Sequence, residues 1–143
     1  MNKVIAFLEK QKGQIITETP SPVGLWLQGK LIHVEEGKLI VEFVVRKEMT
    51  NPVGMLHGGM IALIADELIG ATVATLDLGR FFVSINLNTD FLYGAKLNQT
   101  VIAETEIIRQ GKNMINAECK IYNSDKKIIA KASSNLSISN LKK

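Results

Sequence analysis

The chain has 143 residues, of which 46% are hydrophobic and 22% are charged, and its formal net charge is +3. These values are typical of one globular domain that buries its own core, so we expect residues 1–143 to form a single domain. The small positive excess is spread along the chain and lacks the basic clusters with interleaved aromatic residues of nucleic-acid-binding proteins. We therefore expect no nucleic-acid partner, and only a weak preference for an anionic small ligand.

The cysteine and hydropathy patterns favour a cytoplasmic protein. The single cysteine, Cys119, excludes an intrachain disulfide, and the alternating run around it predicts a thiol on a strand rather than a nucleophile. The N-terminal run is interrupted by Glu9, Lys10 and Lys12, unlike the apolar core of a signal peptide. The apolar segment 60–76 is shorter than a usual membrane span and contains two carboxylates, so no membrane association is expected.

The first third of the chain predicts one short helix and two strands. Apolar positions spaced among charges indicate an amphipathic helix over residues 2–12, closed by Gly13. Two prolines mark residues 17–24 as a connector, because proline cannot continue regular structure. Alternating apolar residues then predict strands at 25–35 and 38–47.

One long helix and four further strands complete the expected fold. The helix is expected over residues 58–76. Four runs with strand-like patterns follow, at 81–93, 100–110, 113–123 and 127–139. One central helix packed on one face of an antiparallel sheet of about six strands is an α+β arrangement.

The helix over residues 58–76 is apolar on nearly every side, which indicates that it is buried on most faces. Asp66 and Glu67 are the exceptions. Adjacent helical residues point about 100° apart, so the two carboxylates cannot share one polar stripe. A structural salt bridge stays open for Asp66, and an exposed position or a basic partner stays open for Glu67.

The start of this helix has the features of an oxyanion site. Gly58 and Gly59 leave its first amide groups accessible, and the helix dipole favours negative charge there, such as the oxygen of a carbonyl group whose carbon becomes tetrahedral. His57 precedes them and is equally consistent with a structural role at the helix start. His33 and Cys119 are the only other imidazole or thiol groups, so no metal site is expected, and the absence of nucleotide-binding motifs predicts no cofactor.

The spacing between His57 and Asp66 constrains how they can act together. Nine helical residues correspond to about 13 Å along the axis and about 900° of rotation, which leaves the two on opposite faces. One chain cannot bring its own Asp66 to its own helix start, whereas two helices antiparallel about a two-fold axis can. If these groups act together, the protein must be at least a dimer.

The run NPVGMLHGG, residues 51–59, with Asp66 nine positions after the histidine, resembles the hotdog-fold thioesterases. The similarity is greatest to the phenylacetate-pathway branch and its mammalian acyl-CoA thioesterase relatives. It continues through VSINLNTDFL and RQGKNM and covers about residues 23–139. The resemblance implies a curved antiparallel sheet wrapped around one long central helix. It also implies dimers with active sites at their interface, which often pair again into tetramers.

The same resemblance implies roles for individual residues. Asp66 would attack the thioester carbonyl or activate water to do so. The amide of Gly58 would polarise the carbonyl oxygen with help from the side chain of Asn51. His57 would hold this loop and contact the thiol leaving group, and Ser84 would orient the attacking water.

The implied substrate is an acyl-CoA thioester, hydrolysed to a carboxylic acid and CoA. Gly59, Met60 and Leu56 are the expected substrate-binding residues, and Met55 and Ile61 are further candidates for an apolar pocket. The CoA phosphates require basic residues. The candidates are Arg80, Arg109, Lys112 and Lys126.

Two other functions remain open. A hotdog dehydratase or hydratase of 3-hydroxyacyl thioesters also uses a histidine and an acid across a dimer interface. A non-catalytic acyl-CoA sensor normally has an added DNA-binding segment, and residues 1–24 are too short for a helix-turn-helix domain.

Glu67 is an alternative carboxylate, because other hotdog branches use a glutamate in this helix. The sequence departs from many relatives at Gly94 and Asn98, where they have proline and glycine.

Overall fold

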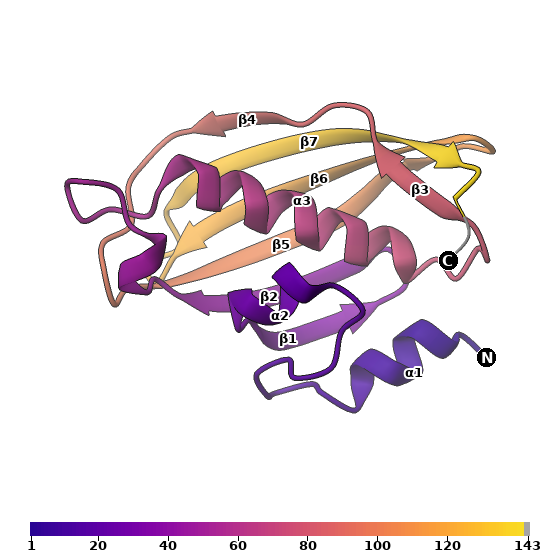
Figure 1. Cartoon of the computed structure of the whole chain (residues 1–143), viewed down its shortest axis with the longest axis horizontal. Coiled ribbons are helices and arrows are strands. Elements are labelled where there is room, and N and C mark those ends of the chain that lie inside the picture. Colours follow the sequence, from indigo (N-terminus) through magenta and orange to yellow (C-terminus); the bar gives the residue numbers. More distant parts are fainter. Residues whose placement is uncertain (142–143) are drawn as a thin grey trace.

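The computed structural model describes residues 1–141, in which one antiparallel sheet curves around a single long helix (Figure 1). Within this range the strands are β1 (Lys30–Glu35), β2 (Lys38–Val44), β3 (Phe81–Ser84), β4 (Asn88–Phe91), β5 (Thr100–Gln110), β6 (Met114–Asn123) and β7 (Ile128–Ser139). Their order is β1-β2-β5-β6-β7-β3, and β4 also pairs with β7. The predicted α+β fold, a curved antiparallel sheet around a central helix, is confirmed.

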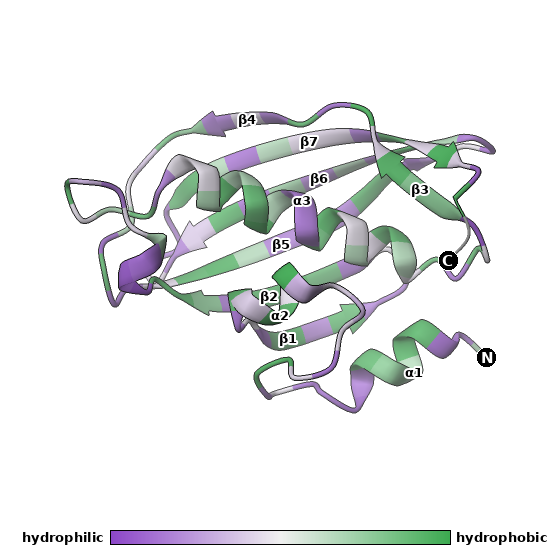
Figure 2. Ribbon diagram, viewed as in Figure 1, coloured by the Kyte–Doolittle hydropathy of each residue, from purple (hydrophilic) through white to green (hydrophobic). Residues whose placement is uncertain are grey.

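Helix α3, Gly58–Ala74, packs on the concave face of the sheet. Its buried residues are Ile61, Ile64, Ala65, Leu68, Ile69, Thr72 and Val73. Each aliphatic side chain buried in this way contributes about 1.5–3 kcal/mol of transfer free energy. The hydropathy colouring shows an apolar helix with one hydrophilic break near its middle (Figure 2). Because β5, β6 and β7 hold α3 along its length, groups on the helix keep fixed positions relative to the sheet.

The N-terminal segment differs from its prediction at the connector. The expected helix over 2–12 forms as α1, Lys3–Glu9. The prediction of a connector at 17–24 and a strand from 25 is wrong, because Pro22–Leu27 form helix α2 and β1 begins only at Lys30. Proline suits the first position of a helix, where no amide donor is needed.

Side chains from outside α2 hold its two ends. The hydroxyl of Ser21 accepts from the amide of Gly24 at 3.2 Å. Arg46 donates to the carbonyls of Leu27 and Trp26 at 2.9 and 2.7 Å and lies over the Trp26 ring. The predicted strand 38–47 is also shorter, because Lys47–Met49 form a 3₁₀ turn, η1.

The predicted strand 81–93 is two strands, β3 and β4, separated by residues 85–87. Asn86 causes the break. Its carbonyl accepts from the hydroxyl of Ser134 at 2.8 Å, and its side-chain oxygen accepts from the amide of Asn135 at 2.9 Å. Both strands pair with β7, so the other edge of each has no strand partner among residues 1–141. The other strands of this half, and α3, begin and end within two residues of the prediction.

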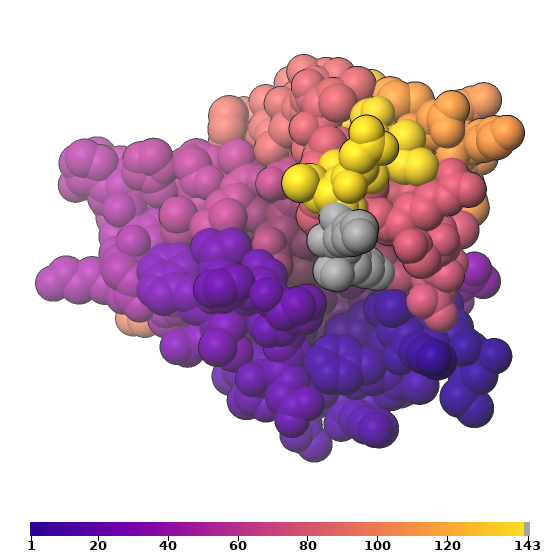
Figure 3. Space-filling view, turned by 45° about the vertical axis from the view of Figure 1, so that its right-hand side comes forward, coloured from indigo at the N-terminus to yellow at the C-terminus, as the bar shows by residue number. Residues whose placement is uncertain are grey.

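The N-terminus is anchored beside the C-terminal end of α3. The side-chain amide of Asn2 donates to the carbonyl of Thr75 at 2.6 Å, and the amide of Lys3 donates to Asp77 at 3.2 Å. The space-filling view shows the indigo N-terminal residues next to the salmon segment near residue 80 (Figure 3). In the described part of the chain, no helix has the length and hydrophobicity of a membrane span.

Cys119 is predicted to be inert in the folded protein. It is buried on β6, and this burial raises the pKa of its thiol to about 12. A thiol reagent such as DTNB at pH 8 should therefore label no cysteine in native buffer and one per chain in guanidinium chloride. Complete labelling of the native protein within minutes would contradict this placement of Cys119.

Candidate functional site

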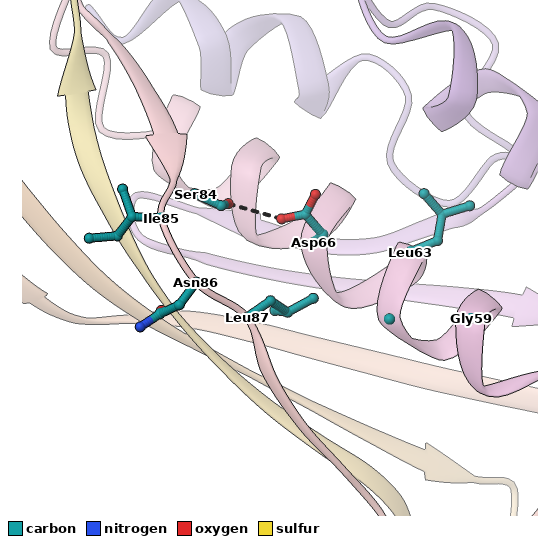
Figure 4. Close-up of a pocket in the computed structure, with 8 residues that line it drawn as sticks. Gly59, Leu63, Asp66, Ser84, Ile85, Asn86 and Leu87 are labelled. Carbon is teal, nitrogen blue, oxygen red and sulfur yellow. Dashed lines mark hydrogen bonds between the residues drawn. The ribbon is translucent and has the colours of Figure 1, made fainter.

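An open groove of about 440 Å³ lies between the exposed side of α3 and the segment that follows β3. Its lining residues are Gly59, Ala62, Leu63, Asp66, Ser84, Ile85, Asn86 and Leu87. The close-up shows Ser84 and Asp66 pointing toward one another across it (Figure 4). The hydroxyl of Ser84 donates to Oδ1 of Asp66 at 2.9 Å. Asp66 is therefore an exposed carboxylate held by one hydrogen bond, and it is the only charged lining residue.

The structural salt bridge considered for Asp66 is not present among residues 1–141, where the ion pairs are His33–Glu35 and Arg46–Glu48. Glu67 lies away from the groove. Its carboxylate packs against Gly24 of α2, where a Cβ atom would collide with it. The two acidic residues thus meet different neighbours, as their 100° separation on a helix requires.

The start of α3 is organised by His57. The side chain of His57 accepts at Nδ1 from the amide of Gly59 at 2.8 Å, and its carbonyl accepts from the amides of Met60 and Ile61. The amide of Gly58 has no hydrogen-bond acceptor among the described residues. A Cβ atom on Gly58 would lie 3.2 Å from the ring of Phe91, so a larger residue would crowd this donor.

Asn51 organises the loop before α3. Its side-chain oxygen accepts from the amides of Val53 and Met55 at 3.1 and 3.0 Å. Gly54, with φ of +78°, allows the tight turn between them. These two bonds hold the side chain of Asn51 by its oxygen. Its side-chain NH₂ group makes no hydrogen bond within residues 1–141. This loop and the helix start therefore present two free N–H donors.

The structure separates these groups into two half-sites. We call Asp66 and Ser84 the acid half, and Asn51 and Gly58 the donor half. Eight residues of continuous α3 separate Gly58 from Asp66, which corresponds to about 12 Å along the axis. A carbonyl group cannot contact both halves of one chain. One chain therefore keeps the carboxylate of the acid half and the N–H groups of the donor half too far apart to contact the same group.

The candidate substrate-binding residues have different surroundings. Gly59 lines the groove, and Met60 is half-buried against the core. Leu56 is 5% exposed and Ile61 is 4% exposed, so both pack in the core instead of lining the groove. The terminal methyl group of Met55 packs on Gly94, and a Cβ atom there would require this flexible side chain to shift.

At position 98, the other departure from the family pattern, asparagine keeps the backbone conformation that glycine adopts easily. Its φ is +68°, in the left-handed region that glycine adopts freely and asparagine tolerates better than most residues.

The candidate phosphate-binding residues are all exposed. Arg80, Arg109 and Lys112 lie at one end of the sheet, and Lys126 lies in the hairpin at the other.

Sequence reasoning did not identify Ala62 and Leu63 on the groove side of α3. It also missed Ile85, Asn86 and Leu87 in the groove and Phe91 beside Gly58. Treating residues 81–93 as one strand conceals these last four, because regular alternation gives no reason for consecutive residues to line one groove. The asparagine in the middle of that run is the signal that could have found the break. In the described part of the chain, no group of three or more His, Cys, Asp or Glu residues could hold a metal ion.

Comparisons with known proteins agree on one family. The model of the thioesterase superfamily matches residues 53–130. Human acyl-coenzyme A thioesterase 13 is 31% identical over 84 residues, which cover 59% of this chain and 60% of that protein. The match therefore spans about three fifths of this relative's length.

Two solved structures have the same fold. The PaaI protein of the Escherichia coli phenylacetic acid degradation operon superposes with a TM-score of 0.81 and 20% identity, covering 96% of this chain and 92% of that one. A hypothetical thioesterase of Streptococcus pneumoniae, solved with coenzyme A, has a TM-score of 0.75 and 21% identity, covering 80% and 88%. These identities support similarity of fold rather than of substrate.

The capping role of His57 can be tested separately from any chemistry. The substitution His57→Ala removes the acceptor for the Gly59 amide and should lower the free energy of unfolding by about 1 kcal/mol. His57→Asn should restore most of this loss, because asparagine is among the best capping residues. Urea denaturation measures both values. Equal stability of the alanine variant and the original protein would show that the cap contributes nothing.

Proposed function

The chain belongs to the thioesterase superfamily and has its hotdog fold, and from this premise we propose that it hydrolyses acyl-CoA thioesters to a carboxylic acid and CoA. The observation that carries the proposal is the exposed carboxylate of Asp66, hydrogen-bonded to Ser84 in an otherwise uncharged groove. The name of the human relative and the coenzyme A in the streptococcal structure support this substrate class.

Asp66 supplies the attack on the thioester carbonyl. It takes a proton from a water molecule that adds to the carbonyl carbon, or it adds directly and forms an anhydride that water then cleaves. In both cases the C–S bond breaks, the electron pair leaves with sulfur, and the CoA thiolate departs without needing a strong acid. Ser84 orients either the carboxylate or the water through the hydrogen bond at 2.9 Å.

The donor half stabilises the oxyanion that the attack creates. The free amide of Gly58 and the side-chain NH₂ of Asn51 supply two donors, and the positive end of the α3 dipole adds to them. His57 fixes this helix start through the Gly59 amide, and in the proposed site it contacts the leaving thiol. Because about 12 Å separates the halves in one chain, the donors come from Gly58 and Asn51 of the partner subunit.

An exposed surface suited to such a dimer surrounds the acid half. The outer side of α3 has small residues that allow a second helix to approach, namely Gly59, Ala62, Gly70 and Ala74. Beside it, the unpaired edge of β3 and β4 exposes Ile85 and Phe91, each 58% accessible, and Leu92, 53% accessible. Unpaired strand edges and exposed apolar side chains are typical of surfaces that associate. We therefore propose a homodimer that uses this surface. Further pairing into tetramers is proposed from the family resemblance, and a cytoplasmic location from the single cysteine and the interrupted N-terminal run.

Two alternatives use the same fold. A hydratase or dehydratase would act on 3-hydroxyacyl thioesters, and hydration of crotonyl-CoA measured beside hydrolysis separates it from a thioesterase. A sensor would bind acyl-CoA tightly without turnover. The similarity of NPVGMLHGG to the thioesterases, which includes the Asn-Pro-x-Gly lead-in before His57, favours hydrolysis over hydration.

The substitution Asp66→Asn tests the proposal most simply. It keeps the size of the side chain and removes the base, so kcat on a good acyl-CoA should fall by about 100-fold or more. Glu67→Gln is the matched control and should remain active, since Glu67 lies against Gly24 outside the groove. A panel of acyl-CoA thioesters assayed with a thiol-trapping dye measures both. Unimpaired turnover by Asp66→Asn would remove Asp66 from the mechanism.

A further inference from the structure

The aromatic ring of Phe91 lies against the donor half of the proposed site. A Cβ atom placed on Gly58 would lie 3.2 Å from Cε1 and 3.4 Å from Cζ of this ring, so the ring edge faces the backbone of Gly58. The amide nitrogen of Gly58 and this Cβ position are attached to the same Cα atom, by bonds of about 1.5 Å. The ring and the free N–H therefore border the same small space.

The backbone that carries this ring is fixed by the sheet. Phe91 is the last residue of β4 and pairs with buried Ala130 on β7. Directly after it, the amides of Leu92 and Tyr93 both donate to the carbonyl of Ile129, at 2.9 and 3.1 Å. In Figure 1, β4 ends at the same end of the molecule where α3 begins. Because β7 holds β4 and also packs against α3, the backbone of Phe91 keeps its distance from the start of the helix.

The ring of His57 borders the same helix start from another direction. A Cβ atom on Gly59 would lie 3.0 Å from Nδ1 of His57, whereas a Cβ atom on Gly58 would meet Phe91. Adjacent helical residues point about 100° apart, so the two rings flank the helix start on different sides. One side is therefore polar and the other is apolar.

The two sides differ in what they offer to a thioester. Nδ1 of His57 accepts from the Gly59 amide, so in the neutral imidazole the proton is on Nε2, which makes no hydrogen bond within residues 1–141. This N–H can donate to the departing thiolate. The ring of Phe91 has no donor, and its exposed apolar surface suits the first carbons of an acyl group. A carbonyl group that accepts from Gly58 and Asn51 therefore directs its sulfur toward His57 and its acyl carbon toward Phe91.

We propose that Phe91 makes the site selective for acyl groups that are unbranched at the α carbon, the carbon next to the carbonyl. This inference rests on the proposed function, because it concerns the acyl side of the same thioester. With the carbonyl oxygen held at the Gly58 amide, the α carbon lies next to the ring edge. A CH₂ group fits in contact with the ring there, whereas a methyl branch has to occupy space that the ring fills. The gap beside Gly58 gives no relief, since even a single Cβ atom there would be 3.2 Å from the ring.

The position of Phe91 on an exposed edge requires a matched control. This edge belongs to the surface proposed above to associate with a partner, so a substitution there can change the fraction of assembled enzyme. Leu92 follows Phe91 on the same edge and has similar accessibility, 53% against 58%. The atoms nearest the Cβ position of Gly58 belong to Phe91 and not to Leu92. Leu92→Ala therefore disturbs the edge without removing the ring.

A ratio of two rates tests the inference independently of assembly. The substrates are the straight-chain acyl-CoA with the highest kcat/KM and its isomer with one methyl branch at the α carbon. Both are measured on one preparation, so unfolded or dissociated protein lowers both values equally and cancels from their ratio. The intrinsic reactivity of the two isomers is the same for every variant.

The substitution Phe91→Ala should raise kcat/KM for the branched isomer. It should lower the straight-to-branched ratio by about 10-fold or more, the usual effect of one methyl group in a confined pocket. Leu92→Ala should keep the original ratio. Release of the CoA thiol, followed with a thiol-trapping dye, measures every rate.

Three results would overturn the inference while leaving the proposed function intact. One is an unchanged ratio in Phe91→Ala, and another is a ratio that falls only because the straight-chain substrate is hydrolysed more slowly. The third is an equal fall in Leu92→Ala, because the selectivity would then depend on the edge as a whole and not on the ring. If the original protein hydrolyses no thioester, the proposed function fails, and this inference fails with it.

Discussion

The fixed distance between Gly58 and Asp66 along helix α3 is the constraint on which the rest of the structure depends. A helix advances 1.5 Å per residue, so eight residues keep the amide of Gly58 about 12 Å from Asp66 along the axis. The helix is packed against the sheet along its length and cannot bend to bring them together. An oxyanion donor must lie about 3 Å from the oxygen it stabilises. The acid half and the donor half of one chain therefore cannot serve the same carbonyl, and the proposed site requires a second copy for this reason.

Each half is prepared by contacts within its own chain. On the donor side, His57 occupies the amide of Gly59, and Asn51 uses its side-chain oxygen for the preceding loop. These bonds fix the backbone while leaving two N–H donors free, which is the preorganisation that catalysis by charge stabilisation requires. On the acid side, the break at Asn86 ends β3 after Ser84 and leaves that hydroxyl facing Asp66. The irregular features of the fold thus occur at the proposed site.

Patterns of burial made much of this fold predictable. The strands β5, β6 and β7 and the helix α3 have regular periodicity, because one face of each packs on the core. Elements held by single side chains were not predictable in this way. Helix α2 depends on Arg46, which is distant in sequence, and Pro22 is as compatible with a connector as with a helix start. The division of 81–93 depends on Asn86 bonding to β7. The spacing between Asp66 and the glycines at the helix start, by contrast, was visible in the sequence.

Mixing two inactive variants measures the sharing of the site most directly. Asp66→Asn removes the acid half, and Gly58→Pro removes the amide donor at a first helical position that accepts proline, after His57 with ψ of 138°. If the halves come from different subunits, co-expression creates mixed dimers in which one of two sites is intact. About a quarter of the original hydrolysis should then return, because random mixing makes about half of the dimers mixed. Mixed dimers that remain as inactive as either parent would contradict a site shared between subunits.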